Sequence, residues 1–155
     1  MKTNLSANRQ KGILLLEAMI AILLFSVGVL AVVGLQANAI KNVAQSKFRS
    51  DGAFLANQIL GQMWSDRANI PDYALPSGSS AFVTAWATQV GNTLPNATGT
   101  NAPTITITPT AYAGPPSYTA YQITVTVRWQ TAEEANSSPR PAAHQHITTA
   151  TITCC

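Results

Sequence analysis

One carboxylate lies inside the most apolar stretch of this sequence. Residues 13–35 read ILLLEAMIAILLFSVGVLAVVGL, and Glu17 is the single charged side chain among them. A charged side chain costs about 2.5–3.5 kcal/mol at the centre of a bilayer, and less near the bilayer surface. Glu17 therefore needs a cationic partner, and it is the first candidate for a functional side chain.

A new amino terminus would be such a partner. If the chain is cut after Gly12, Ile13 carries a positive amine and Glu17 becomes the fifth residue. In an assembly of copies, Glu17 of one copy can meet the Ile13 amine of the next. At 4 Å and an effective dielectric near 20, this attraction is about 4 kcal/mol before desolvation. Because desolvation cancels much of it, we expect the pair to fix register more than to add stability.

A weaker candidate site combines two histidines with the two cysteines of the chain. His144 and His146 alternate on a predicted strand, so both rings would share a face, and Cys154 with Cys155 would complete a zinc set. Adjacent cysteines chelate one metal poorly, so exposed imidazoles are the favoured interpretation, and we expect no metal and no cofactor. We expect free thiols; a strained bridge between neighbours or pairing with another chain are the alternatives.

Patterns typical of enzymes and of nucleic-acid binding are absent from the sequence. There is no nucleotide-binding glycine motif, no nucleophile elbow and no His-Glu-x-x-His. Glu133 and Glu134 lie in a Ser/Pro/Asn-rich stretch without a candidate partner, which favours a solvated loop. The net charge of +3 comes from the first twelve residues, and no basic stripe alternates with aromatic residues. We therefore expect neither an enzyme nor a nucleic-acid partner.

The elements that position Glu17 follow from the apolar pattern. At about 1.5 Å per residue, a helix over residues 13–35 crosses the roughly 30 Å of hydrocarbon in a bilayer. An apolar stripe at helical spacing follows, which predicts one helix from about residue 14 to 66 with an apolar first half and an amphipathic second half. The stripe consists of Ile40, Ala44, Phe48, Leu55, Ile59 and Met63. Pro71 is expected to end this helix at Asn69–Pro71.

The rest of the chain predicts a small β-rich head. Ser79 or Ser80 is expected to cap a short helix with one apolar side, formed by Phe82, Val83, Trp86 and Val90. Trp86 is interpreted as a core residue. Alternation predicts strands at 104–108, 121–129 and 146–153, joined by loops at 109–116 and 131–141. The fold class is therefore α+β, with the amphipathic half of the long helix packed on one face of a small antiparallel sheet.

The start of the chain resembles the class III leader of type IV prepilins. Lys11-Gly12 precedes Ile-Leu-Leu-Leu-Glu at 13–17, and most family members have Phe at the position of Ile13. The resemblance implies that a prepilin peptidase cuts between Gly12 and Ile13 and methylates Ile13, and that Glu17 acts in assembly. It also implies a removed leader at 1–12, a membrane-spanning and polymerising half-helix at 13–35, an amphipathic half-helix at 36–67 and a periplasmic head at 68–155.

Further along, the sequence is similar to PilV-type minor pilins, in FLANQILGQMWSDRAN, in a short Trp-bearing helix ending in Leu94-Pro95, and in VTVRW before an acidic loop. This resemblance implies a type IV pilus subunit that primes filament assembly and contributes to adhesion near the tip. Its partners would be other minor pilins, the major pilin and the inner-membrane assembly platform. The chain would cross the bacterial inner membrane once before it enters the surface filament. A minor pseudopilin of type II secretion, or a non-polymerising single-span protein with a ligand- or metal-binding head, remain the alternatives.

Overall fold

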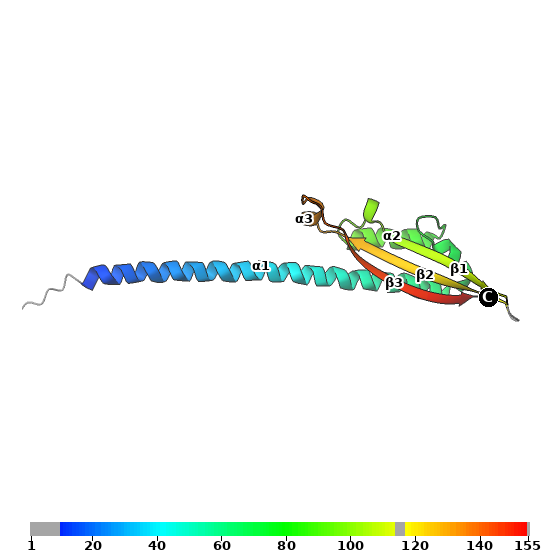
Figure 1. Ribbon diagram of the computed structural model, residues 1–155, viewed down its shortest axis with the longest axis horizontal. Helices are drawn as coiled ribbons and strands as arrows, with labels where there is room; N and C mark the ends of the chain where they lie inside the picture. Colours follow the sequence, from blue (N-terminus) through cyan, green and yellow to red (C-terminus); the bar gives the residue numbers. More distant parts are fainter. Residues whose placement is uncertain (1–9, 114–116, 155) are drawn as a thin grey trace, which may run out of the picture. The chain divides into compact units, whose positions relative to one another are not determined.

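The computed structural model describes residues 10–113 and 117–154 (Figure 1). The chain divides into two compact units, Met1–Ala44 and Gln45–Cys155. We call the first the helical unit and the second the globular unit. Helix α1 (Gln10–Ser65) supplies all described residues of the helical unit and the first element of the globular unit.

The described part of the helical unit buries nothing within itself. Its apolar side chains are exposed, from 45% for Val29 to 73% for Phe25. The helix is long and apolar enough to cross a membrane. The predicted long helix is confirmed, although α1 begins at Gln10 rather than near residue 14.

The globular unit contains a three-stranded antiparallel sheet in the order β1-β2-β3. Its strands are β1 (Thr104–Tyr112), β2 (Tyr118–Trp129) and β3 (His144–Cys154), so the three predicted strands are confirmed and each is longer than predicted. The prediction that the loop begins at Pro109 was wrong, because β1 continues to Tyr112. Since β1 is an edge strand, the missing N–H of Pro109 is tolerated there.

One face of the sheet forms the core together with α1. On β2 the alternating residues Ile123, Val125, Val127 and Trp129 are buried, as predicted. The C-terminal part of α1 covers them with Leu55, Ile59 and Met63, each 1% exposed or less. Ile40 was wrongly included in this stripe: it is 69% exposed, because it belongs to the helical unit and not to the globular core.

Helix α2 (Ala81–Thr93) packs beside α1, with Ser80 at its predicted N-cap position. The Trp86 side chain is buried, and its Nε1 donates a hydrogen bond of 2.9 Å to the Leu55 carbonyl. This bond fixes α2 to α1 and confirms Trp86 as a core residue. Phe82 is 40% exposed, so its predicted place on the buried side was wrong.

Short helical segments connect the main elements: η1 (Arg67–Tyr73), η2 (Gly99–Asn101) and α3 (Ala132–Ala135). The prediction that Pro71 ends the long helix was wrong in detail, because α1 ends at Ser65 and Pro71 lies within η1. Asp66 organises this corner: its carboxylate accepts hydrogen bonds from Asn69 Nδ2 at 2.7 Å and from the Tyr73 hydroxyl at 2.9 Å. Burial and the neighbouring Asp66 raise the pKa of Tyr73.

Candidate functional site

Glu17 lies on α1 among exposed apolar side chains. Ile13, Leu14 and Leu16 beside it are 60% to 68% exposed. Within residues 12–44, no hydrogen bond or ion pair engages the Glu17 carboxylate. The charge expected to need a partner therefore finds none in the described part of its own unit.

The structure places Gly12, Ile13 and Glu17 in one continuous helical segment. Residues four apart on a helix share a face, with Cβ atoms about 5–6 Å apart, so Ile13 and Glu17 lie one above the other. Gly12 has open space around it, with nothing within 4 Å of the position of a Cβ atom. Ile13 and Glu17, the predicted methylation and assembly residues, therefore share one face of α1, and Gly12 immediately precedes Ile13 in the same helix.

The weak metal candidates are not brought together. His144 pairs in register with Trp129 and Cys154 with Thr119, at opposite ends of β3. At about 3.3 Å per residue, ten residues separate them by roughly 33 Å. Cys154 is disulfide-bonded, so the expectation of a free thiol was wrong for Cys154, and it has no thiolate to offer a metal. Cys155 lies outside the described residues.

His146 is the other histidine of that set, and it is engaged locally. Its Nε2 lies 2.8 Å from the Thr148 hydroxyl oxygen on the same strand. His144 contacts Glu134 instead, so the two rings have different partners although they share a face of β3. Among the described residues no group of three His, Cys, Asp or Glu side chains is placed to hold a metal ion.

Glu134 was expected to be solvated without a partner, and this was wrong. His144 Nε2 donates a hydrogen bond of 2.8 Å to Glu134 Oε1, and Gln45 Nε2 donates one of 3.3 Å to the same oxygen. Glu134 also forms a capping box with Thr131 at the start of α3. The hydrogen bond from His144 is the main reason that the pKa of Glu134 lies below its ordinary value. The Thr131-x-x-Glu134 spacing was the signal in the sequence for this cap.

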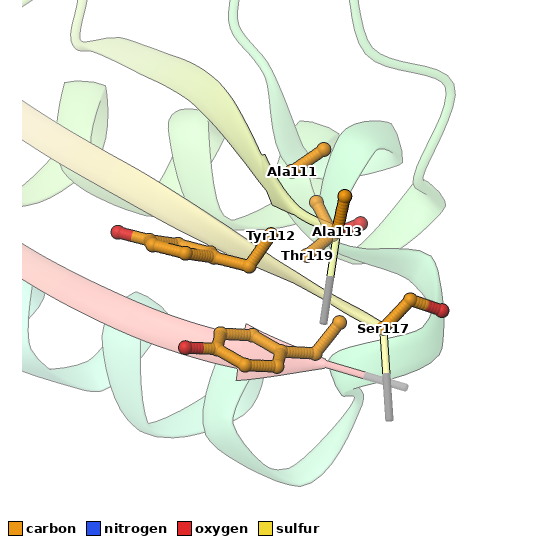
Figure 2. A pocket seen from close by; sticks show the side chains of 6 residues that line it. Ala111, Tyr112, Ala113, Ser117 and Thr119 are labelled. Carbon is orange, nitrogen blue, oxygen red and sulfur yellow. The ribbon is translucent and has the colours of Figure 1, made fainter. Parts of the chain in front are cut away.

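A second feature that the sequence did not predict is a pair of tyrosines at the end of the β1–β2 hairpin. Tyr112 and Tyr118 are directly opposite in register, and their rings stack with centroids 4.8 Å apart and planes 20° apart. Figure 2 shows Tyr112 among the side chains that line an open depression at this end of the hairpin. The sequence did contain a signal for this longer strand: the alternation of side chains with a period of two continues from Thr108 through Thr110 to Tyr112 despite Pro109.

The described residues thus offer an unpaired carboxylate on an exposed apolar helix, an internal Glu134–His144 contact and an exposed tyrosine pair. None of these three described features places a nucleophile beside a base. No known protein family, characterised protein or solved structure matches the chain.

Proposed function

We propose that this chain is a minor pilin, a subunit that joins a type IV pilus through its N-terminal helix. The observation that carries the proposal is Glu17, a lone carboxylate on an exposed apolar helix, one turn after a Gly12–Ile13 bond that resembles a prepilin cleavage site. Cleavage by prepilin peptidase creates the Ile13 amine, and methylation follows. Glu17 of each subunit then pairs with the amine of a neighbouring subunit in the filament.

The helical unit supports this proposal by what it leaves uncovered. Its apolar side chains need a low-dielectric environment, which the inner membrane supplies before assembly and neighbouring helices supply afterwards. Near the bilayer surface the Glu17 carboxylate is tolerated but unpaired, whereas in the filament it pairs with a cation. This difference favours movement of the subunit from the membrane into the filament. The partners are other minor pilins, the major pilin and the inner-membrane assembly platform, and the globular unit faces the periplasm.

Mass spectrometry of the protein isolated from its own host tests the processing step. We expect a chain that begins at Ile13 with a methylated amine. The same measurement in a strain that lacks prepilin peptidase should give the full-length chain, which is the matched control. A chain that keeps residues 1–12 in cells with an active peptidase would exclude the proposal.

The role of Glu17 is tested with the carboxylate removed or moved. E17A should insert into the membrane normally but enter filaments poorly, because the cationic amine of the neighbour loses its partner. The matched control is E17A/A21E, which keeps the charge and composition of the helix but moves the carboxylate one turn further from Ile13. If this variant or E17A is incorporated as well as the natural chain, Glu17 does not set the register.

Deletion of the gene separates a pilus subunit from a secretion pseudopilin. Loss of surface fibres with normal enzyme export is the outcome expected for a minor pilin. Loss of exported enzymes with normal fibres would assign the chain to a type II secretion system. Complementation with the natural chain should restore the lost property in either case.

A further inference from the structure

Two aromatic rings remain in solvent at the described end of the β1–β2 hairpin. Tyr112 is 47% exposed and Tyr118 is 40% exposed, and they stack on each other instead of entering the core. The two rings form a small exposed aromatic patch beside an open depression. A stacked pair is also held in place before any ligand arrives, so little side-chain freedom is lost on binding.

The depression beside the rings is open and small. Its volume is about 230 Å³, and Ala111, Ala113, Ser117 and Thr119 complete its lining (Figure 2). Enclosed sites for small molecules measure roughly 300–1,000 Å³. A ligand would therefore lie across this surface, over the rings, rather than inside a cavity.

The tyrosines continue into rows of neutral polar side chains on the outer face of the sheet. Residues directly opposite in antiparallel strands share a face, and this face is turned away from the core residues Ile123 and Val125. In Figure 1 the strands lie in front of α2 and the C-terminal part of α1, so the viewer looks onto the outer face. The row residues are Thr110, Ala120 and Thr153, then Thr108, Gln122 and Thr151, then Thr106, Thr124 and Thr149; Ala120 is the one apolar member and is buried.

No charged side chain belongs to these described rows. Arg128 is the first cation further along the same face, and it is already engaged: its Nη1 lies 3.4 Å from both the Ala102 carbonyl oxygen and the Thr104 hydroxyl oxygen. The surface between the tyrosines and Thr106 therefore offers the exposed sides of the stacked rings, hydroxyl groups and one amide, with the small Ala120 between Thr110 and Thr153. A phosphate or an acidic membrane surface would find no counter-charge there.

We propose that Tyr112, Tyr118 and the threonine rows bind a neutral oligosaccharide of β-linked pyranose units. The C–H face of a pyranose ring stacks on a tyrosine ring, and the sugar hydroxyls exchange hydrogen bonds with the threonine hydroxyls and the Gln122 amide. An equatorially linked sugar chain is extended, as the rows are. This binding site does not depend on the proposed assembly function.

The test measures binding of the purified full-length chain to cellohexaose and chitohexaose by calorimetry. The detergent must lack a sugar headgroup, because an alkyl glycoside would compete for the site. Y112A and Y118A should each weaken binding about tenfold, since each loses the apolar area of the ring in addition to an aromatic contact of about 0.5–1.5 kcal/mol. Y112F and Y118F keep the ring and should bind more tightly than the alanine variants, because they lose at most one neutral hydrogen bond, whereas alanine also loses the aromatic contact and the apolar area of the ring.

Phe82→Ala is the matched control, because Phe82 has the same 40% exposure as Tyr118 but lies on α2. It should leave binding unchanged, and circular dichroism should show the same fold for all variants. The proposal is overturned if neither oligosaccharide binds, or if the alanine variants bind as well as the natural chain. Equal binding of an acidic oligogalacturonate would also overturn it, because the neutral rows would then not select the ligand.

Discussion

The two units use apolar side chains in opposite ways along the same helix. Ile22 in the helical unit is 66% exposed, whereas Ile59 in the globular unit is fully buried against the sheet. Both side chains are isoleucine on α1, so neither residue type nor secondary structure explains the difference. The helical unit leaves its apolar side chains exposed, whereas the globular unit buries most of its own in its core.

The largest expected effect on stability comes from replacing isoleucine by alanine once in each unit. Ile59→Ala should lower the unfolding free energy of the globular unit by about 2–5 kcal/mol, because it leaves a cavity against the sheet. Ile22→Ala should change it by less than about 0.5 kcal/mol. Tryptophan fluorescence during denaturation of the full-length chain in detergent measures this, since all three tryptophans lie in the globular unit. Equal effects of the two variants would refute the separation of the units.

Two glycines of α1 give a comparison within the globular unit. Gly61 has nothing within 4 Å of the position that a Cβ atom would take, so Gly61→Ala should stabilise the helix by about 0.5–1 kcal/mol. At Gly52 the added Cβ would lie 3.2 Å from Cζ3 of Trp129, a ring that is 1% exposed and packed in the core. Gly52→Ala should therefore lose about 1 kcal/mol through overpacking. The same denaturation measurement decides it, and stabilisation by Gly52→Ala would show that the Trp129 ring has room to move.

The smallest expected effect concerns the contact between Glu134 and His144. Gln45, the first residue of the globular unit, donates a hydrogen bond to the same Glu134 oxygen. The pKa of Glu134 is lowered mainly by this hydrogen bond, so the folded state favours the charged carboxylate. Its contribution is therefore complete above the ordinary pKa of 4.5 and is lost as the pH falls through the lower folded value. Because the pair is partly solvated, we expect about 0.2–1 kcal/mol.

Glu134→Gln isolates this charge, because glutamine can still form the capping box with Thr131. The variant should lose stability near neutral pH and should show a weaker fall in unfolding free energy as the solution is acidified. Denaturation curves recorded across the acidic range measure the slope. A slope identical to that of the natural chain would mean that another carboxylate causes the acid sensitivity.

The sequence predicted those features that depend on neighbours along the chain. Strict alternation from Tyr121 to Trp129 identified the buried face of β2, and the Trp86 side of α2 followed from helical spacing. The stripe of α1 was assigned too far towards the N-terminus, because periodicity does not reveal where the sheet begins to cover a helix. Ile40 is the residue that shows this limit.

The remaining differences arise from contacts between residues that are distant in sequence. Gln45 and Glu134 are 89 positions apart, so no local pattern could pair them. Whether Pro109 ends a strand depends on which strand forms the edge of the sheet, and this is a property of the whole sheet. At the candidate assembly site the sequence named Gly12, Ile13 and Glu17, and the structure adds that all three lie in α1, with Ile13 and Glu17 on the same face; their cleavage and pairing with another subunit are still predictions.

The two edge strands of the sheet, β1 and β3, differ in how well they are protected against pairing with a strand of another molecule. Along β1, the Leu75 amide donates to the Ile105 carbonyl at 3.0 Å, and Pro109 removes one backbone donor. β3 pairs only with β2 among the described strands, and residues 144–154 contain neither proline nor lysine, the usual deterrents to strand addition. Unwanted aggregation of concentrated protein should therefore start at β3, and one lysine at the exposed Gln145 is the simplest protection against it.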